Sequence, residues 1–220
     1  MTRRAADKTM AVSSHGEETR LKLIQAATPE FIEQGFRAAR VQQIAQRAGV
    51  RLSAINYHFG GKEGLYLAVL RHHGEQAIQQ QPLQIEASLP LPDRFRFMVH
   101  SMLLRMLDEH QSSQIAQLIL REMANPTAAL DDIYQRFQQP QLQQILTLLQ
   151  QILPNAEPRT LLRCALSLLG QCVIYVLARP VIARTDPHLL TQPNGLAEIE
   201  NHIVQFSWAG LMALRETSHA

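Results

Sequence analysis

Apolar residues recur at helical spacing along most of this chain, and this pattern constrains the fold more than any other feature. Leu21, Ile24 and Phe31 begin the series, at intervals that place them on one face of a helix. No segment shows the sustained alternation of apolar and polar residues that a half-buried strand requires. The expected helices span about 15–34, 41–47, 52–58, 62–80, 93–109, 113–124, 127–151, 158–179 and 196–215. We therefore predict an all-α protein of about nine helices.

Proline and capping residues divide the chain into parts. Ser14 and Glu17 have the spacing of a capping box, which predicts that the first helix begins there. Pro82, Pro90 and Pro92 interrupt the pattern after the helix that ends near residue 80, which indicates a connecting segment. The expected organisation is a flexible arm over 1–13, an N-terminal helical domain over 14–80 and a larger helical domain over 81–220.

Two further prolines fall inside expected helices. Pro29 lacks an N–H group and its ring clashes with the preceding turn, at a cost of about 3 kcal/mol in a regular helix. We therefore expect a kink at Pro29, before the helix stops at Gly35. For the same reason we expect the helix over 127–151 to bend at Pro140.

The charge is distributed unevenly between the two predicted domains. Residues 1–80 hold eleven Lys and Arg against seven Asp and Glu, a balance of +4, whereas residues 81–220 hold ten against twelve, a balance of −2. The chain is 46% hydrophobic and 18% charged, so it is not a disordered tail. A mildly basic first domain on a slightly acidic body suits nucleic-acid binding.

The cysteines and the apolar segments indicate the cellular compartment. Cys164 and Cys172 lie two helical turns apart, too far for a disulfide, which favours a reducing cytoplasm. The polar N-terminus lacks the apolar core of a signal peptide. The most apolar stretch, 164–178, is shorter than the roughly 20 residues that span a bilayer, so we expect a core or interface helix and no membrane partner.

Residues 41–60 combine a short helix, a turn at Gly49 and a second short helix. Glycine suits this turn because it adopts positive φ at little cost. With Ile55 facing inward, the helical period turns Asn56 and Tyr57 away from the core, together with Ser53. A helix that presents such a face can enter the major groove of DNA while the first helix supports it.

Motifs in and around this unit resemble those of the TetR/AcrR family of regulators, and the run over 56–66 is similar to the CecR-type branch in particular. The segment from Arg121-Glu122-Met123 to Asn125-Pro126 is similar to the same branch. The motif positions are Ala26, Ala27, Phe31, Gly35, Phe36, Ile44, Ala45, Ala48, Gly49, Val50, Ile55, Asn56, Tyr57, His58, Phe59, Lys62, Glu63 and Leu65.

This resemblance implies a helix-turn-helix that binds double-stranded operator DNA. Arg40 stands where relatives carry a capping Thr, and Asn56 could pair with an adenine edge. Lys62 opens the next helix, where free N–H groups and the helix dipole favour phosphate. The expected DNA-binding residues are Arg40, Gln42, Gln43, Arg51, Leu52, Ser53, Ala54, Asn56, Tyr57, His58 and Lys62.

The resemblance also implies a homodimer, joined through the helices over 158–179 and 196–215, and a small-molecule effector in the C-terminal body. Apolar residues cover much of both helices, which independently indicates partners on more than one side. A two-fold dimer should bind an inverted repeat, and repression is the expected outcome. The candidate ligand-binding residues are Arg121, Glu122, Gln171, Tyr175 and His202.

Other interpretations of the same residues stay open at this point. Tyr57 could be a core aromatic, His58 a structural histidine, and Arg40 and Arg51 solvated charges. The chain could also be a helical protein-interaction module that has lost DNA binding. We expect no enzyme, no cofactor and no metal, because isolated serines such as Ser101 lack a neighbouring base. The adjacent His72 and His73 point about 100° apart on a helix and lack further metal ligands nearby.

Overall fold

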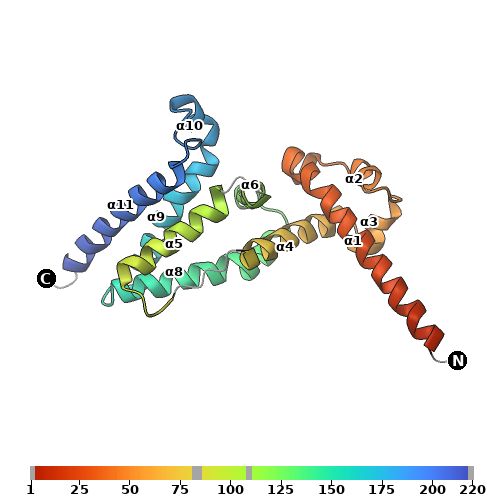
Figure 1. Cartoon of the computed structure of the whole chain (residues 1–220), viewed down its shortest axis with the longest axis horizontal. Helices are drawn as coiled ribbons and strands as arrows, with labels where there is room; N and C mark the ends of the chain where they lie inside the picture. The colour runs from red at the N-terminus through yellow and green to blue at the C-terminus, as the bar shows by residue number, and fades with distance from the viewer. Residues whose placement is uncertain (1–2, 81–85, 108–110, 218–220) are drawn as a thin grey trace.

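The computed structural model describes residues 3–80, 86–107 and 111–217, with side chains from residue 16 onward and from residue 116 after the second gap. These residues contain no strand, so the all-α prediction is confirmed over the described parts of the chain. The helices form an N-terminal head and a C-terminal body, and α4 and α6 lie between them (Figure 1). The chain termini lie at opposite ends of the molecule (Figure 1).

The first four helices belong to the head, and the remaining elements follow in chain order. The head helices are α1 (Arg3–Ala38), α2 (Val41–Arg47), α3 (Ser53–Phe59) and α4 (Lys62–Gln80). The remaining elements are α5 (Leu91–Leu107), α6 (Gln111–Ala124), α7 (Leu130–Ile133), the π-helical turn η1 (Tyr134–Gln138), α8 (Gln139–Ile152), α9 (Pro158–Leu177), α10 (Arg179–Thr185) and α11 (Gly195–Thr217).

The first helix begins earlier than predicted and is interrupted at Gly35, where its end was predicted. It begins at Arg3, so residues 3–13 of the segment expected as a flexible arm over 1–13 are helical; the Ala, Arg, Lys and Met residues there favour helix. The backbone leaves helical values at Gly35, with φ 72° and ψ 173°, whereas Pro29, where the bend was expected, lies inside the helix. The kink is therefore at Gly35 because only glycine adopts this φ without strain.

The C-terminal half also departs from the expected boundaries. The predicted bent helix over 127–151 is divided into α7, η1 and α8, with the π-helical turn directly before Pro140. The short helix α10 follows α9 and was not expected from the sequence. Helix α10 has no buried residue, so its sequence carries no helical pattern of apolar residues from which it could be predicted.

Two hydrophobic cores hold the molecule together, and their division differs from the predicted domain boundary near residue 80. The head core combines Phe31, Ile55 and Leu65 with residues of α6, α7 and η1, among them Leu118 and Phe137. Gly74 allows this contact because a Cβ there would lie 2.8 Å from the Phe137 ring. The head is therefore packed against the middle of the chain and not merely tethered to it.

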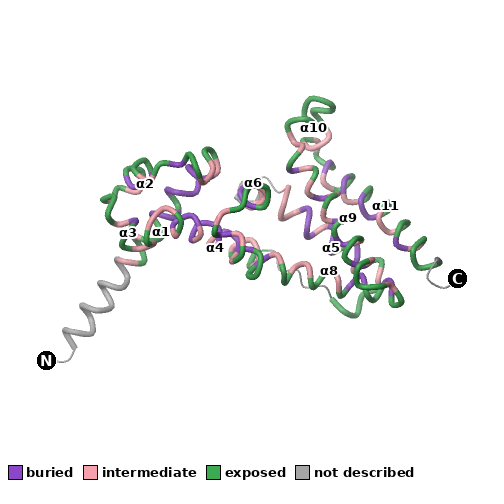
Figure 2. The backbone as a smooth tube through the Cα atoms, turned by 180° about the vertical axis from the view of Figure 1, so that it is seen from behind, coloured by how far each residue is buried: buried purple, intermediate pink, exposed green. Residues whose placement is uncertain are grey.

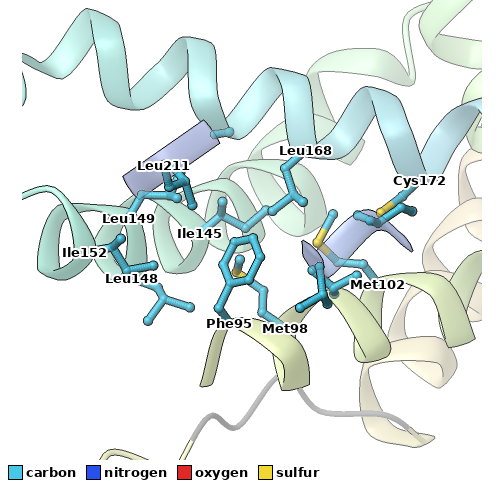
Figure 3. Packing of buried hydrophobic residues seen from close by; sticks show 14 of the residues in the cluster. Phe95, Met98, Met102, Ile145, Leu148, Leu149, Ile152, Leu168, Cys172 and Leu211 are labelled. Atoms are coloured by element: carbon cyan, nitrogen blue, oxygen red, sulfur yellow. The ribbon is translucent and has the colours of Figure 1, made fainter. Parts of the chain in front are cut away.

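The second core lies within the body. Phe95 of α5 packs among Ile145 of α8, Leu168 of α9 and Leu211 of α11 (Figure 3). The outer sides of α9 and α11 are largely exposed in the single chain (Figure 2). By length and composition alone α9 could cross a membrane, but core helices of soluble proteins pass the same test, so this is weak evidence for a membrane.

Candidate nucleic-acid interface

A buried carboxylate of α1 sets the position of α2. Glu30 accepts a hydrogen bond at 3.0 Å from the backbone N–H of Arg40, the residue before α2. Arg47, in the last turn of α2, lies 4.0 Å from the other Glu30 oxygen. With its amide nitrogen turned inward, Gln43 is 3.2 Å from both oxygens. Glu30 therefore anchors the residue that precedes α2, although no side chain caps the helix at Arg40 itself.

The sequence analysis missed Glu30 and gave Gln43 a DNA role alone. The available signal was an acidic residue among the buried apolar residues of α1, since a charge in such a position needs a partner. Gln43 remains exposed and stays a predicted DNA contact, but its amide also belongs to the bracing of α2.

The turn between α2 and α3 is compact and hydrogen-bonded. Gly49 has φ 66°, and the N–H of Val50 donates to the carbonyl of Ala45 at 3.0 Å. This geometry directs the chain into α3 at an angle to α2. The turn expected at Gly49 is therefore present.

Helix α3 places its polar side outward. Ile55 is buried, whereas the side chains of Ser53 and Asn56 are exposed and Tyr57 is 85% exposed. Such a Tyr cannot be a core aromatic, so that alternative is excluded. His58 is half-buried, with its ring centroid 4.9 Å from that of Tyr57.

The remaining predicted contacts surround this face. Arg40, Gln42, Arg51 and Leu52 are exposed, and Ala54 is half-buried. The structure therefore brings the predicted residues of α2 and α3 into one surface on the head. No ion pair with a described residue is recorded for Arg40 or Arg51, and both stay predicted DNA contacts.

Lys62 is partly engaged within the protein. Its ammonium nitrogen donates to the carbonyl of Arg37 at 3.0 Å and lies 5.1 Å from the centre of the Phe36 ring. It thereby joins the start of α4 to the end of α1. The role of Lys62 in binding phosphate stays a prediction. Its ammonium group already contacts the Arg37 carbonyl and the Phe36 ring.

Glycines permit the tight passage from α3 to α4. Gly60 ends α3 in the left-handed region with φ 73°. A Cβ on Gly64 would lie 1.8 Å from the carbonyl oxygen of Phe59, so the first turn of α4 directly touches the end of α3. The orientation of α3 on the head depends on this approach.

A buried hydrogen-bonded group connects α4 with α6. The Tyr66 hydroxyl donates to one Glu122 oxygen at 3.0 Å, and the other accepts from the N–H and hydroxyl of Thr127 at 2.6 and 2.8 Å. Arg121 donates to the carbonyl of Ile32 at 2.5 Å. Burial, followed by the Glu122 charge, raises the pKa of Tyr66, which keeps its proton on the hydroxyl. We call Tyr66, Glu122 and Thr127 the junction cluster.

Ion pairs reinforce the same junction nearer the end of α4. The Arg71 guanidinium binds the Asp132 carboxylate through two nitrogen atoms, one at 2.8 Å, and this hydrogen bonding lowers the pKa of Asp132. Arg136 lies 3.7 Å from Asp132 and 3.5 Å from Glu75. The head and the body segments α6 to η1 are thus joined at several points.

The structure does not bring the five predicted ligand residues together. Arg121 and Glu122 line a polar cavity of about 460 Å³ between α1, α4 and α6. Gln171 lines a separate cavity between α9 and α11. Tyr175 packs at the edge of the body core, and the exposed His202 stacks on Phe206 with ring centroids 5.9 Å apart.

The cavity between α9 and α11 has a volume of about 430 Å³. Buried residues of the body core form its floor. The rest of its lining consists of small or polar residues and two exposed apolar residues, Phe206 and Leu214. We call it the seam cavity. Its lining residues are Phe95, Leu149, Thr160, Arg163, Cys164, Ser167, Leu168, Gln171, Phe206, Ser207, Gly210, Leu211 and Leu214.

Burial determines the protonation of the two cysteine thiols. Burial raises the pKa of the Cys172 thiol to about 12, which keeps it protonated. Burial also raises the pKa of Cys164, which lines the seam cavity. Among the residues whose side chains are described, no group of three or more His, Cys, Asp or Glu could hold a metal ion.

Comparison with known proteins identifies the family. Residues 91–211 match the profile of the C-terminal domain of the HTH-type transcriptional dual regulator CecR, and residues 23–69 match that of bacterial regulatory proteins of the tetR family. The chain belongs to the TetR family, in the CecR-like group. This confirms the resemblance drawn from the motifs, and it is a family of transcription regulators and not of enzymes.

One curated relative and two solved structures are similar to this chain, the two structures in fold. CecR from Shigella flexneri is 32% identical over 142 residues, which are 59% of this chain and 62% of CecR. FadR from Bacillus subtilis, solved with stearoyl-CoA, has a TM-score of 0.63 at 16% identity and covers 85% of this chain and 96% of FadR. AibR, solved with isovaleryl coenzyme A and operator DNA, has a TM-score of 0.65 at 14% identity and covers 86% of this chain and 97% of AibR.

Proposed function

We propose that this protein represses transcription as a homodimer bound to an inverted repeat in operator DNA, and that a small molecule releases it. We infer that it acts in the cytoplasm. The repressing role is our choice among the roles found in relatives, since CecR is described as a dual regulator. The proposal combines the family with three features of this chain.

The exposed face of α3 carries the proposal. Tyr57 exposes 85% of its surface beside Asn56 and Ser53, on a helix that is anchored by the buried Ile55. An exposed tyrosine offers both an apolar ring and a hydroxyl to a partner. Arg40 and Arg51 at the rim favour phosphate groups. We propose that this face enters the major groove and that Asn56 and Tyr57 contact bases or the groove wall.

The outer faces of α9 and α11 supply the proposed dimer contact. Leu166 is 55% exposed and Phe206 is 67% exposed, and Ile174 and Leu177 are exposed on the same helix as Leu166. Clustered large apolar side chains of this kind mark interaction surfaces. A second copy seated there would pair two heads about a two-fold axis, which calls for an inverted repeat.

The junction between head and body is the proposed route for effector control. The junction cluster and the Arg71–Asp132 pair hold α4 against α6 and η1. A ligand that favours a different arrangement of these helices would change the distance between the two heads of a dimer. FadR and AibR were solved with acyl-CoA ligands, which supports a small-molecule effector without naming one for this chain.

Selection of bound duplexes from a random DNA pool tests the proposal. We expect an inverted repeat, with binding that weakens steeply as salt rises because phosphate contacts release counterions. Tyr57→Ala should weaken binding to the selected duplex. Tyr134→Ala is a matched control, since Tyr134 is also exposed but lies on η1. Failure to retain any duplex would contradict DNA binding and leave the protein-interaction alternative.

A further inference from the structure

The seam cavity lies between α9 and α11. It follows the first half of α9 and the second half of α11, and its floor is the buried core surface of Phe95, Leu149 and Leu168. Gln171 donates to the Ser207 hydroxyl at 2.9 Å and so ties the two helices at one side of the cavity. Its volume of about 430 Å³ lies in the range of small-molecule sites.

Small residues keep the cavity open. Ser207 and Gly210 of α11 face Ser167 and Cys164 of α9 across it. A Cβ added to Gly210 would meet no atom within 4 Å. The space is therefore not the result of a clash or a bulky neighbour, but of side chains too short to close it.

The mouth of the cavity opens on the proposed dimer face. Phe206 and Leu214 line the cavity and are also exposed large apolar residues. Leu166, on α9 beside the lining residue Ser167, is exposed as well. A second copy seated on α9 and α11 would therefore lie across the mouth.

We propose that the seam cavity is a ligand site that a second copy of this chain closes, and that it takes an apolar molecule with one anionic group. This inference rests on the proposed dimer. The apolar body of the ligand would lie on Phe95, Leu168 and Leu211 at the floor.

The polar residues of the lining indicate where the anionic group of the ligand would bind. Arg163 is the charged residue in this lining, and its side chain is exposed at the rim. A guanidinium binds a carboxylate or sulfonate through paired hydrogen bonds. Thr160 lies about one turn before Arg163 and Ser167 about one turn after it, on the same face of α9. Their hydroxyls can donate hydrogen bonds to the same anionic group.

Closure by a second copy has a thermodynamic consequence. If the ligand binds the dimer more tightly than the single chain, then ligand must strengthen dimerisation by the same factor. The site thus connects ligand concentration to the assembly that holds two heads on DNA.

The probe for the test is 1-anilinonaphthalene-8-sulfonate, an apolar aromatic sulfonate that becomes fluorescent in apolar surroundings. Full-length protein is titrated with the probe, and reaction of Cys164 with a small thiol reagent is followed by peptide mass. We expect the probe to bind and to slow modification of Cys164, which lines the cavity. Absence of probe binding, or an unchanged rate at Cys164, would overturn the proposal.

Two matched variants locate the probe. Gly210→Leu fills the cavity and should weaken probe binding about tenfold or more, equivalent to about 1.4 kcal/mol. Gly16→Leu adds the same side chain to α1 in the head, where an added Cβ would meet no atom within 4 Å, and should leave probe affinity within about twofold. If both variants lost probe affinity equally, or both kept it, the probe would not bind in the seam cavity and the proposal would be wrong. Circular dichroism checks that both remain folded.

Duplex binding separates this inference from the proposed function. Gly210→Leu should still retain the selected duplex when no probe is present. If no variant and no wild-type protein binds DNA, the proposed function fails, while the probe results still decide whether the cavity is a site.

Discussion

The head and the body of this protein are completed in different ways. In the head, buried polar groups find partners within the same chain: Glu30 binds the start of α2, and Thr28 hydrogen-bonds His73 at 2.8 Å. In the body, Leu166 and Phe206 stay exposed and a cavity of about 430 Å³ remains between two helices. The comparison indicates that one chain suffices to build the head, and we propose that a second copy covers the exposed apolar face of the body.

The boundary between the two regions follows packing and not the linker. Residues of α6, α7 and η1 belong to the head core although they follow the proline-rich segment in sequence. The head core therefore extends beyond the proline-rich segment and includes residues of α6, α7 and η1.

The largest expected effect comes from Gly64→Ala in the head. The new Cβ would lie 1.8 Å from a backbone oxygen of α3, so α3 and α4 must separate. We expect a loss of more than about 3 kcal/mol in the free energy of unfolding, and loss of duplex binding. Gly16→Ala, at an open position of α1, should change stability by less than about 1 kcal/mol in urea unfolding. Similar stability of the two variants would contradict the close approach.

Glu122→Ala tests the contact between head and body. It leaves the buried Tyr66 hydroxyl and the Thr127 N–H without their acceptor, and we expect a loss of about 3 kcal/mol in urea unfolding. Glu33→Ala is a control on the rim of the neighbouring cavity, where the side chain is exposed. If Glu122→Ala were as stable as Glu33→Ala, the junction cluster would not hold the two regions together.

The pH dependence of stability should reside in the head. Burial, followed by the charge of His72, lowers the pKa of His73 from 6.5 to about 4. As pH falls from about 6.5 to 4, the unfolded chain takes up a proton that folded His73 refuses, so the free energy of unfolding falls, by about 3 kcal/mol at most. Urea midpoints measured at several pH values should show this loss in the wild type and a smaller one in His73→Gln. An equal loss of stability in the wild type and in His73→Gln would show that another group causes the pH dependence.

Asn56→Ala should have the smallest of these effects on stability and a selective effect on DNA. The side chain is exposed, so the folded protein should be as stable as the wild type within about 0.5 kcal/mol. Affinity for the selected duplex should fall by about 1–3 kcal/mol if the amide pairs with a base. Competition with duplexes altered at single positions measures this, and a uniform loss across all sequences would indicate a phosphate contact instead.

The sequence predicted those features that local pattern determines. The bounds of α2 agree with the prediction, Ile55 faces inward and Tyr57 outward, and the motif positions led to the correct family. Each of these depends on helical period or on residues close together in the chain.

Features that depend on distant residues were not predicted. The hydrogen bond from the Arg40 N–H to Glu30 joins α1 to the start of α2, and the contact of Gly74 with Phe137 joins segments more than sixty residues apart. Periodicity shows which face of a helix is buried but not which element covers it. The kink at Gly35 instead of Pro29 shows the same limit, because tertiary packing determines which of two helix-breaking residues bends the chain.

The stoichiometry of the protein on its selected duplex tests the central claim most directly. Sedimentation velocity should give two chains per duplex for the wild type. Leu166→Glu, which places a charge on the exposed face of α9, should sediment as a folded single chain and bind the duplex much more weakly, while Leu89→Glu, at another exposed leucine, should behave as the wild type. One wild-type chain per duplex, or an unaffected Leu166→Glu dimer, would contradict the account.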